Sequence, residues 1–280
     1  MTGEMRHRFV DAGGLRMHVA EAGEGRPVVM LHGWPQHWYL WRGVIPLVAP
    51  HRRVICPDLR GFGWTDVPNA SYDRETMARD VLALLDELGL EEIDLVGHDW
   101  GGWIGFLLCL HHPARVRRFL ALGVVPPWPS KNRRTLLEIW RLAYQIPLAL
   151  PGLGRLGVER GLARLALRLG WDAFSTAEIE AFTERLRGER ARASELLYRT
   201  FLLREVGPVA AGRYEKLLPL TVPTLLVNGA RDAVISPRAV REQAAGEDLL
   251  ELEVVPEVGH FVVDEKPELV ADRALSFLAP

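Results

Sequence analysis

A carboxylate occupies the centre of a glycine-flanked turn in this chain. Asp99 lies in segment 97–102, whose sequence is Gly-His-Asp-Trp-Gly-Gly. A short strand is expected over 92–96 and an apolar helix over 102–112, so the segment is predicted to be a sharp strand-to-helix turn. A turn of this form holds one side chain, usually a serine, above the edge of a sheet as a nucleophile. We therefore predict that Asp99 is the nucleophile rather than a simple helix cap.

A carboxylate in place of the usual serine hydroxyl restricts the reactions that this residue can begin. An aspartate with an ordinary pKa of about 3.9 is ionised at neutral pH and needs no base to become nucleophilic. It can attack an sp3 carbon and leave an alkyl ester on the protein. This favours epoxide opening or halide displacement over acyl transfer, and it requires a base that activates water to hydrolyse the ester.

The base and its orienting acid should follow the nucleophile in chain order, with the acid first. His260, in segment 258–261, follows a strand expected over 250–255 and is the predicted base. Asp232 follows a strand expected over 224–227, and we predict that it holds the imidazole in one tautomer. The other position for such an acid, after a strand expected over 119–125, carries none.

Ester hydrolysis also needs donors for a tetrahedral oxyanion. One predicted donor is the backbone N–H of Trp100, directly after the nucleophile. The other is the N–H of Trp34, in the His-Gly-Trp-Pro loop that follows an apolar strand expected over 27–31. His32 and His98 lie in the two loops and are expected to shape them.

The remaining elements should place these loops at one edge of a sheet. Strands are expected over 9–10, 15–20, 27–31, 54–56, 92–96, 119–125, 224–227 and 250–255, and helices over 76–88, 102–112, 237–245 and 267–278. This alternation predicts an α/β fold with a mostly parallel, doubly wound sheet.

The stretch 126–215 does not continue this strand–helix alternation, because it is rich in leucine, arginine and alanine and contains no convincing strand. We predict a helical cap over 126–215, inserted into a core formed by 1–125 and 216–280. A linked second domain is the alternative. The insertion is preferred since the strand–helix alternation resumes afterwards.

Bulk composition excludes several classes of function. The 280 residues carry a net charge of −2 and no block of like charges, so neither nucleic acid nor a membrane is an expected partner. No signal peptide or spanning segment is expected. Cys56 and Cys109 are interpreted as small buried residues rather than a disulfide. We expect a cytoplasmic protein, monomeric or homodimeric.

At this point the chain resembles the α/β-hydrolase-fold epoxide hydrolases. The matching segments are 32–36, 58–63 and 97–102, together with the Asp232 turn and the His260 loop. They span the core from about residue 25 to the end of the chain. The resemblance implies a cis peptide bond between Trp34 and Pro35 and a helical cap whose two tyrosines hold the epoxide oxygen.

Phenols suit that task because epoxide opening creates an alkoxide, and a phenol donates a hydrogen bond without carrying charge. Tyr144, followed by glutamine, is similar to the family's first cap tyrosine, and Tyr198, followed by arginine, resembles the second. The family's Asn-Trp before the second tyrosine is Leu-Leu here. Tyr214 is the reserve candidate.

Three functions are compatible with these residues. The preferred one is hydrolysis of a small hydrophobic epoxide by water to a vicinal diol, with no cofactor and no metal. A haloalkane or haloacid dehalogenase would use the same three residues plus indole donors for the halide, from Trp100 and one of Trp128, Trp140 or Trp171. Dehalogenase groups that resemble this chain carry asparagine at the position of Trp34 or arginine at that of Trp100. A non-catalytic ligand-binding protein would not need Asp99, Asp232 and His260 together.

Overall fold

A single eight-stranded sheet forms the centre of the computed structural model, which describes residues 5–129, 137–168 and 173–279. The strand order is β1-β2-β4-β3-β5-β6-β7-β8; β2 pairs antiparallel with β1 and β4, and all later pairs are parallel. The strands are β1 (Arg6–Ala12), β2 (Leu15–Ala22), β3 (Pro27–Leu31), β4 (Arg53–Pro57), β5 (Ile93–His98), β6 (Val116–Leu122), β7 (Thr224–Gly229) and β8 (Leu250–Val255). The predicted mostly parallel sheet is confirmed.

The central strands are buried on both faces, as their continuous apolar sequences predict. The prediction for β6 is wrong by three residues at each end, because the strand runs over Val116–Leu122 instead of 119–125. The chain leaves the sheet at Gly123, whose φ is 55° and where a Cβ would lie 2.9 Å from the His260 carbonyl oxygen. The apolar residues that follow suggested a strand, but this backbone turn ends it.

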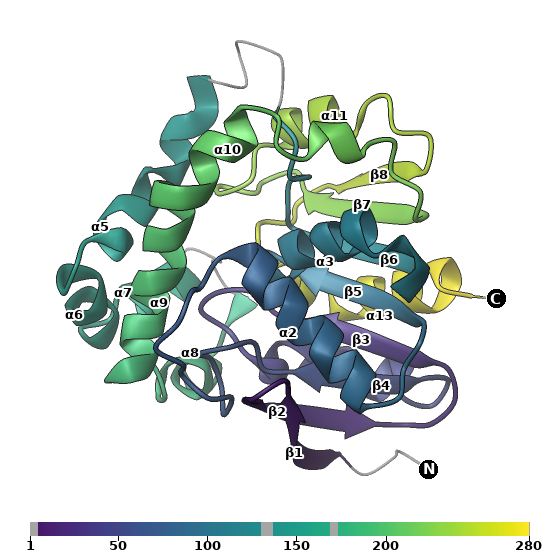
Figure 1. Cartoon of the computed structure of the whole chain (residues 1–280), viewed down its shortest axis with the longest axis horizontal. Helices are drawn as coiled ribbons and strands as arrows, with labels where there is room; N and C mark the ends of the chain where they lie inside the picture. The colour runs from purple at the N-terminus through teal and green to yellow at the C-terminus, as the bar shows by residue number, and fades with distance from the viewer. Residues whose placement is uncertain (1–4, 130–136, 169–172, 280) are drawn as a thin grey trace.

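Helices cover both faces of the sheet, which confirms the doubly wound arrangement (Figure 1). On one face pack α2 (Arg74–Glu87), α3 (Trp100–His111) and α11 (Pro237–Ala244). On the other pack η1 (Trp38–Gly43), α1 (Ile45–Val48), α12 (Val262–Glu265) and α13 (Pro267–Phe277). A short turn, η2 (Pro113–Arg115), follows α3. The short elements η1, α1 and α12 were not predicted, since four to six residues hold too little periodicity to show a helix.

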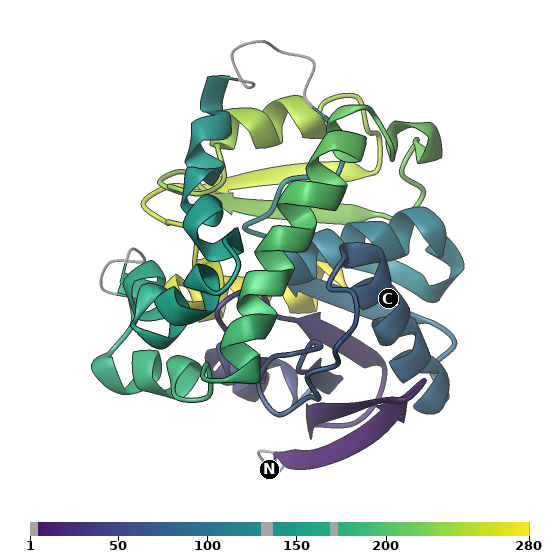
Figure 2. The same cartoon turned by 60° about the vertical axis from the view of Figure 1, so that its left-hand side comes forward.

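Between β6 and β7 the described residues form helices and turns without a strand. They are η3 (Leu137–Tyr144), α5 (Gln145–Ala149), α6 (Leu153–Glu159), α7 (Leu162–Arg168), α8 (Thr176–Thr183), α9 (Glu189–Thr200), the π-helical turn η5 (Phe201–Glu205), α10 (Val206–Ala210) and η6 (Glu215–Leu217). The long helix α9 lies beside α5 and α6 at one side of the sheet (Figure 2). We propose that 126–215 is the cap; parts of it, 130–136 and 169–172, lie outside the described residues.

Both cysteines are buried and free, as predicted. In the part of the chain that the structure describes, no helix has the length and apolar character needed to cross a bilayer.

The turn after β5 gives a direct test of the packing that positions Asp99. A Cβ on Gly101 would lie 2.3 Å from the Leu31 carbonyl oxygen, so Gly101→Ala forces α3 away from β3. We expect the free energy of unfolding to fall by about 1–3 kcal/mol in urea denaturation. Gly207→Ala is the matched control, because a Cβ there meets no atom within 4 Å and alanine favours helix. Equal stability of Gly101→Ala and the parent would contradict the packing argument.

Candidate active site

Asp99 occupies the sharp turn between β5 and α3. Its φ of 50° and ψ of −119° are strained for a residue with a side chain. Hydrogen bonds fix this conformation, because the Asp99 N–H donates to the Leu122 carbonyl at 3.1 Å and the Trp103 N–H donates to the Asp99 carbonyl at 3.0 Å. A Cβ on Gly97 would meet the Gly101 carbonyl oxygen at 2.5 Å. The glycines on both sides of Asp99 are therefore required by close backbone contact.

The carboxylate of Asp99 faces the loop after β3. The Trp34 N–H donates to Asp99 Oδ2 at 2.9 Å, and a Cβ on Gly33 would lie 2.4 Å from the same oxygen. Burial raises the pKa of Asp99, while His260 and the backbone N–H groups of Trp34 and Trp100 oppose the rise. The structure thus places both predicted N–H donors at this carboxylate.

His32 fixes the shape of that loop. Its Nε2 accepts the Leu59 N–H at 2.9 Å, so the ring hydrogen resides on Nδ1, which donates to the Gly33 carbonyl at 2.9 Å. Burial lowers the pKa of His32 to about 4, which keeps the ring neutral. The peptide bond between Trp34 and Pro35 is cis, as the family resemblance implied.

His260 and Asp232 meet at the same edge of the sheet. His260 Nδ1 lies 3.0 Å from Asp232 Oδ2, and the other oxygen of Asp232 accepts the N–H groups of Val234 and Ile235 at 2.8 and 2.7 Å. The opposite ring nitrogen, His260 Nε2, lies 3.9 Å from Asp99 Oδ1. The three predicted residues therefore form one connected set, with the imidazole between two carboxylates.

This arrangement controls the charge on His260. Burial lowers the pKa of the imidazole, but the carboxylates of Asp232, Asp99 and Glu265 raise it, and the net pKa is about 9. Glu265 was not predicted from the sequence. Its Oε2 accepts the Gly259 N–H at 2.7 Å, so it also fixes the loop that carries His260.

His98, the residue before Asp99, contacts the loop that carries His260. Its Nε2–H donates to the His260 carbonyl at 3.0 Å, and burial lowers its pKa to about 3. A neutral ring at this point fixes the backbone of His260 without adding charge beside it.

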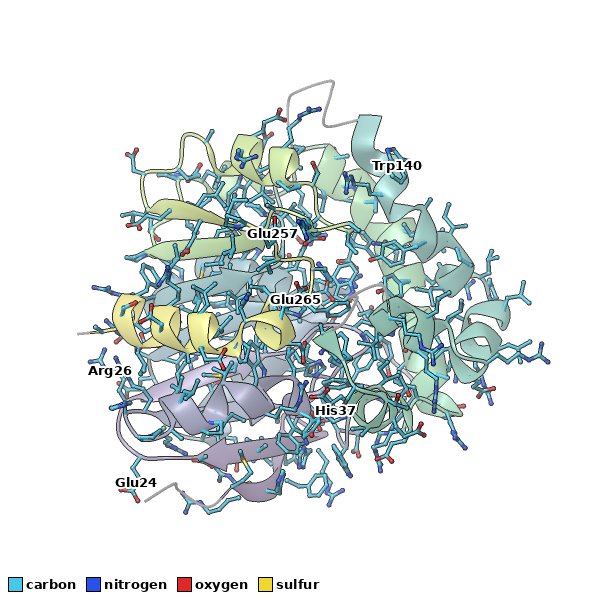
Figure 3. All side chains as sticks on the ribbon, turned by 180° about the vertical axis from the view of Figure 1, so that it is seen from behind. Glu24, Arg26, His37, Trp140, Glu257 and Glu265 are labelled. Carbon is cyan, nitrogen blue, oxygen red and sulfur yellow. The ribbon has the colours of Figure 1, made fainter. Side chains whose placement is uncertain are left out.

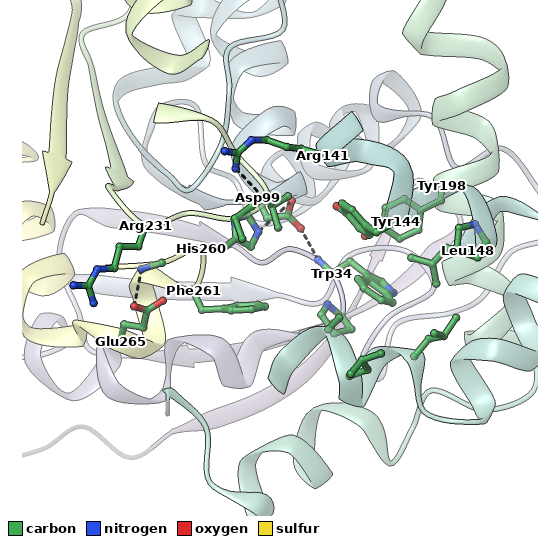
Figure 4. Close-up of a pocket in the computed structure, with 18 of the residues that line it drawn as sticks. Trp34, Asp99, Arg141, Tyr144, Leu148, Tyr198, Arg231, His260, Phe261 and Glu265 are labelled. Atoms are coloured by element: carbon green, nitrogen blue, oxygen red, sulfur yellow. Dashed lines mark hydrogen bonds and ion pairs between the residues drawn. The ribbon is translucent and has the colours of Figure 1, made fainter. Parts of the chain in front are cut away.

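Asp99 and His260 line a cavity of about 400 Å³ between the sheet and the cap helices. Figure 4 shows them between Arg231 and Glu265 on one side and Tyr144 and Tyr198 on the other. Apolar side chains make up much of the remaining lining: Trp34, Pro35, Pro147, Leu148, Leu162, Leu165, Ala166, Val234 and Phe261. Such a cavity fits a small, largely apolar molecule beside the Asp99 carboxylate.

Tyr144 and Tyr198 line the cavity from the cap. Their rings meet edge to face with centroids 6.1 Å apart, and Tyr198 also packs edge to face on Trp34 at 5.2 Å. Burial raises the pKa of both phenols, so both remain protonated donors at neutral pH. Tyr214 does not line the cavity; its hydroxyl donates to Glu75 at 3.0 Å.

Comparison with known proteins agrees with this geometry. The sequence model of the α/β hydrolase fold family matches residues 26–267. A soluble epoxide hydrolase of Corynebacterium sp. (strain C12) is 32% identical, and the match covers 100% of this chain and 99% of that protein. The chain belongs to the α/β-hydrolase-fold epoxide hydrolases.

Two solved structures of this family match nearly the whole chain. The epoxide hydrolase CorEH without ligand has a TM-score of 0.84 and 31% sequence identity, and the match covers 99% of each chain. Epoxide hydrolase VrEH1 from Vigna radiata has a TM-score of 0.84 and 26% identity, over 98% of each chain. The predicted fold and family are therefore confirmed.

The indole groups considered for a halide are arranged differently from the phenols. The Trp128 indole N–H donates to the Gln243 carbonyl at 2.6 Å, and Trp140 is 67% exposed on the outside of the cap (Figure 3). Trp171 lies outside the described residues. The Trp100 ring packs edge to face on Tyr198 with centroids 5.8 Å apart, and Trp100 is not among the residues that line the cavity.

Arg141 is a site residue that sequence analysis did not identify. It lies in η3, lines the cavity and donates to the carbonyls of Asp232 and Ala233 at 3.3 and 3.1 Å (Figure 4). It thereby joins the cap to the loop that carries Asp232. No local pattern predicts a contact across 91 residues of sequence. Among the described residues, no group of three His, Cys, Asp or Glu side chains is placed to hold a metal ion.

The charge on His260 can be measured directly. Replacing Asp232 by asparagine removes the strongest group that raises the pKa of His260, while the burial that lowers it remains. We expect the pKa of His260 to fall well below about 9 when ring chemical shifts of ¹³C-labelled histidine are followed against pH. Glu253→Gln, which affects a carboxylate paired with Arg273, is the control and should change nothing. An unchanged pKa in Asp232→Asn would disprove this electrostatic assignment.

Proposed function

We propose that this protein hydrolyses a small apolar epoxide to a vicinal diol through a covalent ester on Asp99. The observation that supports this most strongly is the pair of protonated phenols, Tyr144 and Tyr198, that line the same cavity as the Asp99 carboxylate. A carboxylate nucleophile needs such donors when the leaving oxygen stays attached to the substrate as an alkoxide.

In the first step, one oxygen of Asp99 attacks an epoxide carbon and the carbon–oxygen bond of the ring breaks. Asp99 Oδ2 already accepts the Trp34 N–H, so Oδ1 is the oxygen left to attack. Tyr144 and Tyr198 donate hydrogen bonds to the alkoxide that forms, and it gains the proton that His260 releases once Asp99 is esterified. The product of this step is a hydroxyalkyl ester in which Oδ2 is the carbonyl oxygen.

In the second step, His260 takes a proton from water, and the water oxygen attacks the carboxyl carbon of the ester, Cγ of Asp99. Negative charge develops on Oδ2, where the N–H groups of Trp34 and Trp100 stabilise it. Collapse of this intermediate breaks the bond between Cγ and Oδ1, and the diol leaves with Oδ1 and the second proton of the attacking water, while His260 keeps the first. Asp99 is regenerated as a carboxylate that contains one oxygen from water.

The charges also change in the order that the two steps need. In the free protein the pKa of His260 is about 9, so the ring is protonated at neutral pH and cannot act as a base. Ester formation neutralises Asp99, one of the groups that raise this pKa, so the pKa of His260 falls. The proton that His260 then releases balances the proton that the alkoxide gains, and the neutral ring can accept a proton from water.

Dehalogenation is the second candidate, because it would use the same Asp99, His260 and Asp232. The outward position of Trp140 and the occupied indole of Trp128 make it less favoured. We further propose a cytoplasmic location, which the two free, buried cysteines support. The choice between monomer and homodimer stays a prediction.

The proposed function predicts a trapped ester. His260→Gln should still be alkylated but should hydrolyse the ester slowly, because no base activates water. After incubation with styrene oxide, intact-mass spectrometry should show the protein plus the full mass of the epoxide. Asp99→Asn should show no adduct, and His51→Gln, at an exposed position, should turn over like the parent.

Two outcomes of this experiment count against the proposal. A butyl adduct from 1-bromobutane, without an adduct from any epoxide, would support dehalogenation instead. The absence of an adduct from every reactive epoxide and halide would favour the non-catalytic binding protein.

A further inference from the structure

A buried ion pair joins the core to the cap directly behind the site. Arg74, the first residue of α2, is fully buried. Its guanidinium donates to both carboxylate oxygens of Glu205, with Nε 2.9 Å from Oε2, and its backbone N–H donates to the same carboxylate at 3.3 Å. Glu205 is the last residue of η5 and only 5% exposed.

The same guanidinium contacts two groups of the site. It donates to the Leu197 carbonyl, from Nη1 at 3.2 Å and from Nη2 at 3.3 Å, and this carbonyl belongs to the peptide bond that joins Leu197 to Tyr198. Its central carbon lies 4.5 Å from the ring centroid of Trp100, the residue after the nucleophile. Arg74 therefore contacts the backbone that carries one cap phenol and the ring that borders it.

The π-helical turn explains how Glu205 reaches Arg74. Helix α9, which carries Tyr198, ends at Thr200 and continues into η5 over Phe201–Glu205. There the Val206 N–H donates to the Phe201 carbonyl, five residues earlier, whereas an α-helix would use the carbonyl four residues earlier. The extra residue in this turn changes the direction of the side chains that follow, and π-helical turns of this kind are frequent at functional sites.

We propose that Arg74, held by Glu205, is a positioning residue for Tyr198: it fixes the α9 backbone so that the Tyr198 phenol meets the alkoxide formed when Asp99 opens an epoxide. This inference rests on the proposed function. Stability alone does not explain the Arg74–Glu205 pair, because apolar residues of similar volume often replace a buried ion pair without loss of folding stability. The fixed fork of a guanidinium can bind a carboxylate and a carbonyl together, which gives geometric precision.

The test replaces both partners, so that no unpaired charge is left in the interior. In Arg74→Met/Glu205→Met we expect the single-turnover rate of ester formation from styrene oxide to fall about 10- to 100-fold. The rate of ester hydrolysis should stay within about threefold, because the groups that act in that step belong to core loops and not to α9: His260, Asp232 and the backbone N–H groups of Trp34 and Trp100. Arg60→Met/Asp80→Met is the matched control, since that pair is also buried but joins α2 to the loop after β4, within the core. It should leave the ratio of the two rates unchanged.

A double-mutant cycle with Tyr198→Phe separates positioning from general damage. If Arg74 acts through Tyr198, the double replacement should slow ester formation by less than about threefold in the Tyr198→Phe background. An undiminished further loss would overturn the proposal, and so would equal slowing of both steps in the Tyr198-containing protein.

Hydrogen exchange tests, without relying on activity, whether the Arg74–Glu205 pair fixes the backbone of α9. Backbone amides of 198–206 should exchange faster in Arg74→Met/Glu205→Met than in the parent, and the Arg60→Met/Asp80→Met control should leave them unchanged. Unchanged exchange in this segment would show that Arg74 and Glu205 do not fix the backbone of α9, and would overturn the proposal. If the parent protein forms no ester with any epoxide, the proposed function fails, while the exchange result still decides whether Arg74 and Glu205 fix α9.

Discussion

The whole site depends on keeping one negative charge, that of Asp99, on a strained backbone beneath an apolar cavity. Burial alone would favour a protonated carboxyl group, which is a poor nucleophile. The protein opposes this with the N–H groups of Trp34 and Trp100 and with a protonated His260. Close packing makes those donors available, because Gly33 lets the loop after β3 approach the carboxylate closely. The glycines are therefore part of the electrostatics of the site as well as of its shape.

The two sides of the cavity supply different chemistry. The core contributes groups whose charges depend on one another, since neutralising Asp99 lowers the pKa of His260 and turns it from an acid into a base. The cap contributes phenols that stay neutral because burial raises the pKa of Tyr144 and Tyr198. Arg141, a charged cap residue that also lines the cavity, donates to the carbonyls of Asp232 and Ala233. In the proposed mechanism the uncharged phenols stabilise the alkoxide.

Most of the core could be predicted from the sequence because its signals are local. Apolar strands, glycine-flanked turns and the loop after each strand located Asp99, Asp232 and His260. Contacts between distant segments could not be predicted: Arg74 meets Glu205 across 131 residues, and Arg141 reaches the Asp232 carbonyl across 91. In a sequence these arginines look like ordinary surface charges of helices. The end of β6 was misplaced for a related reason, since the turn at Gly123 depends on its packing against the His260 loop.

The origin of the oxygen atoms in the first turnover tests the covalent mechanism most directly. With protein in excess over epoxide in H₂¹⁸O, the account predicts one ¹⁸O atom in the Asp99 carboxylate and none from water in the first diol. Water attacks the ester carbon in this mechanism, so the diol receives its new oxygen from Asp99. Mass spectrometry of the peptide that contains Asp99, together with that of the diol, would measure both. Label in the diol and none in Asp99 would show that water attacks the epoxide directly, and would contradict the account.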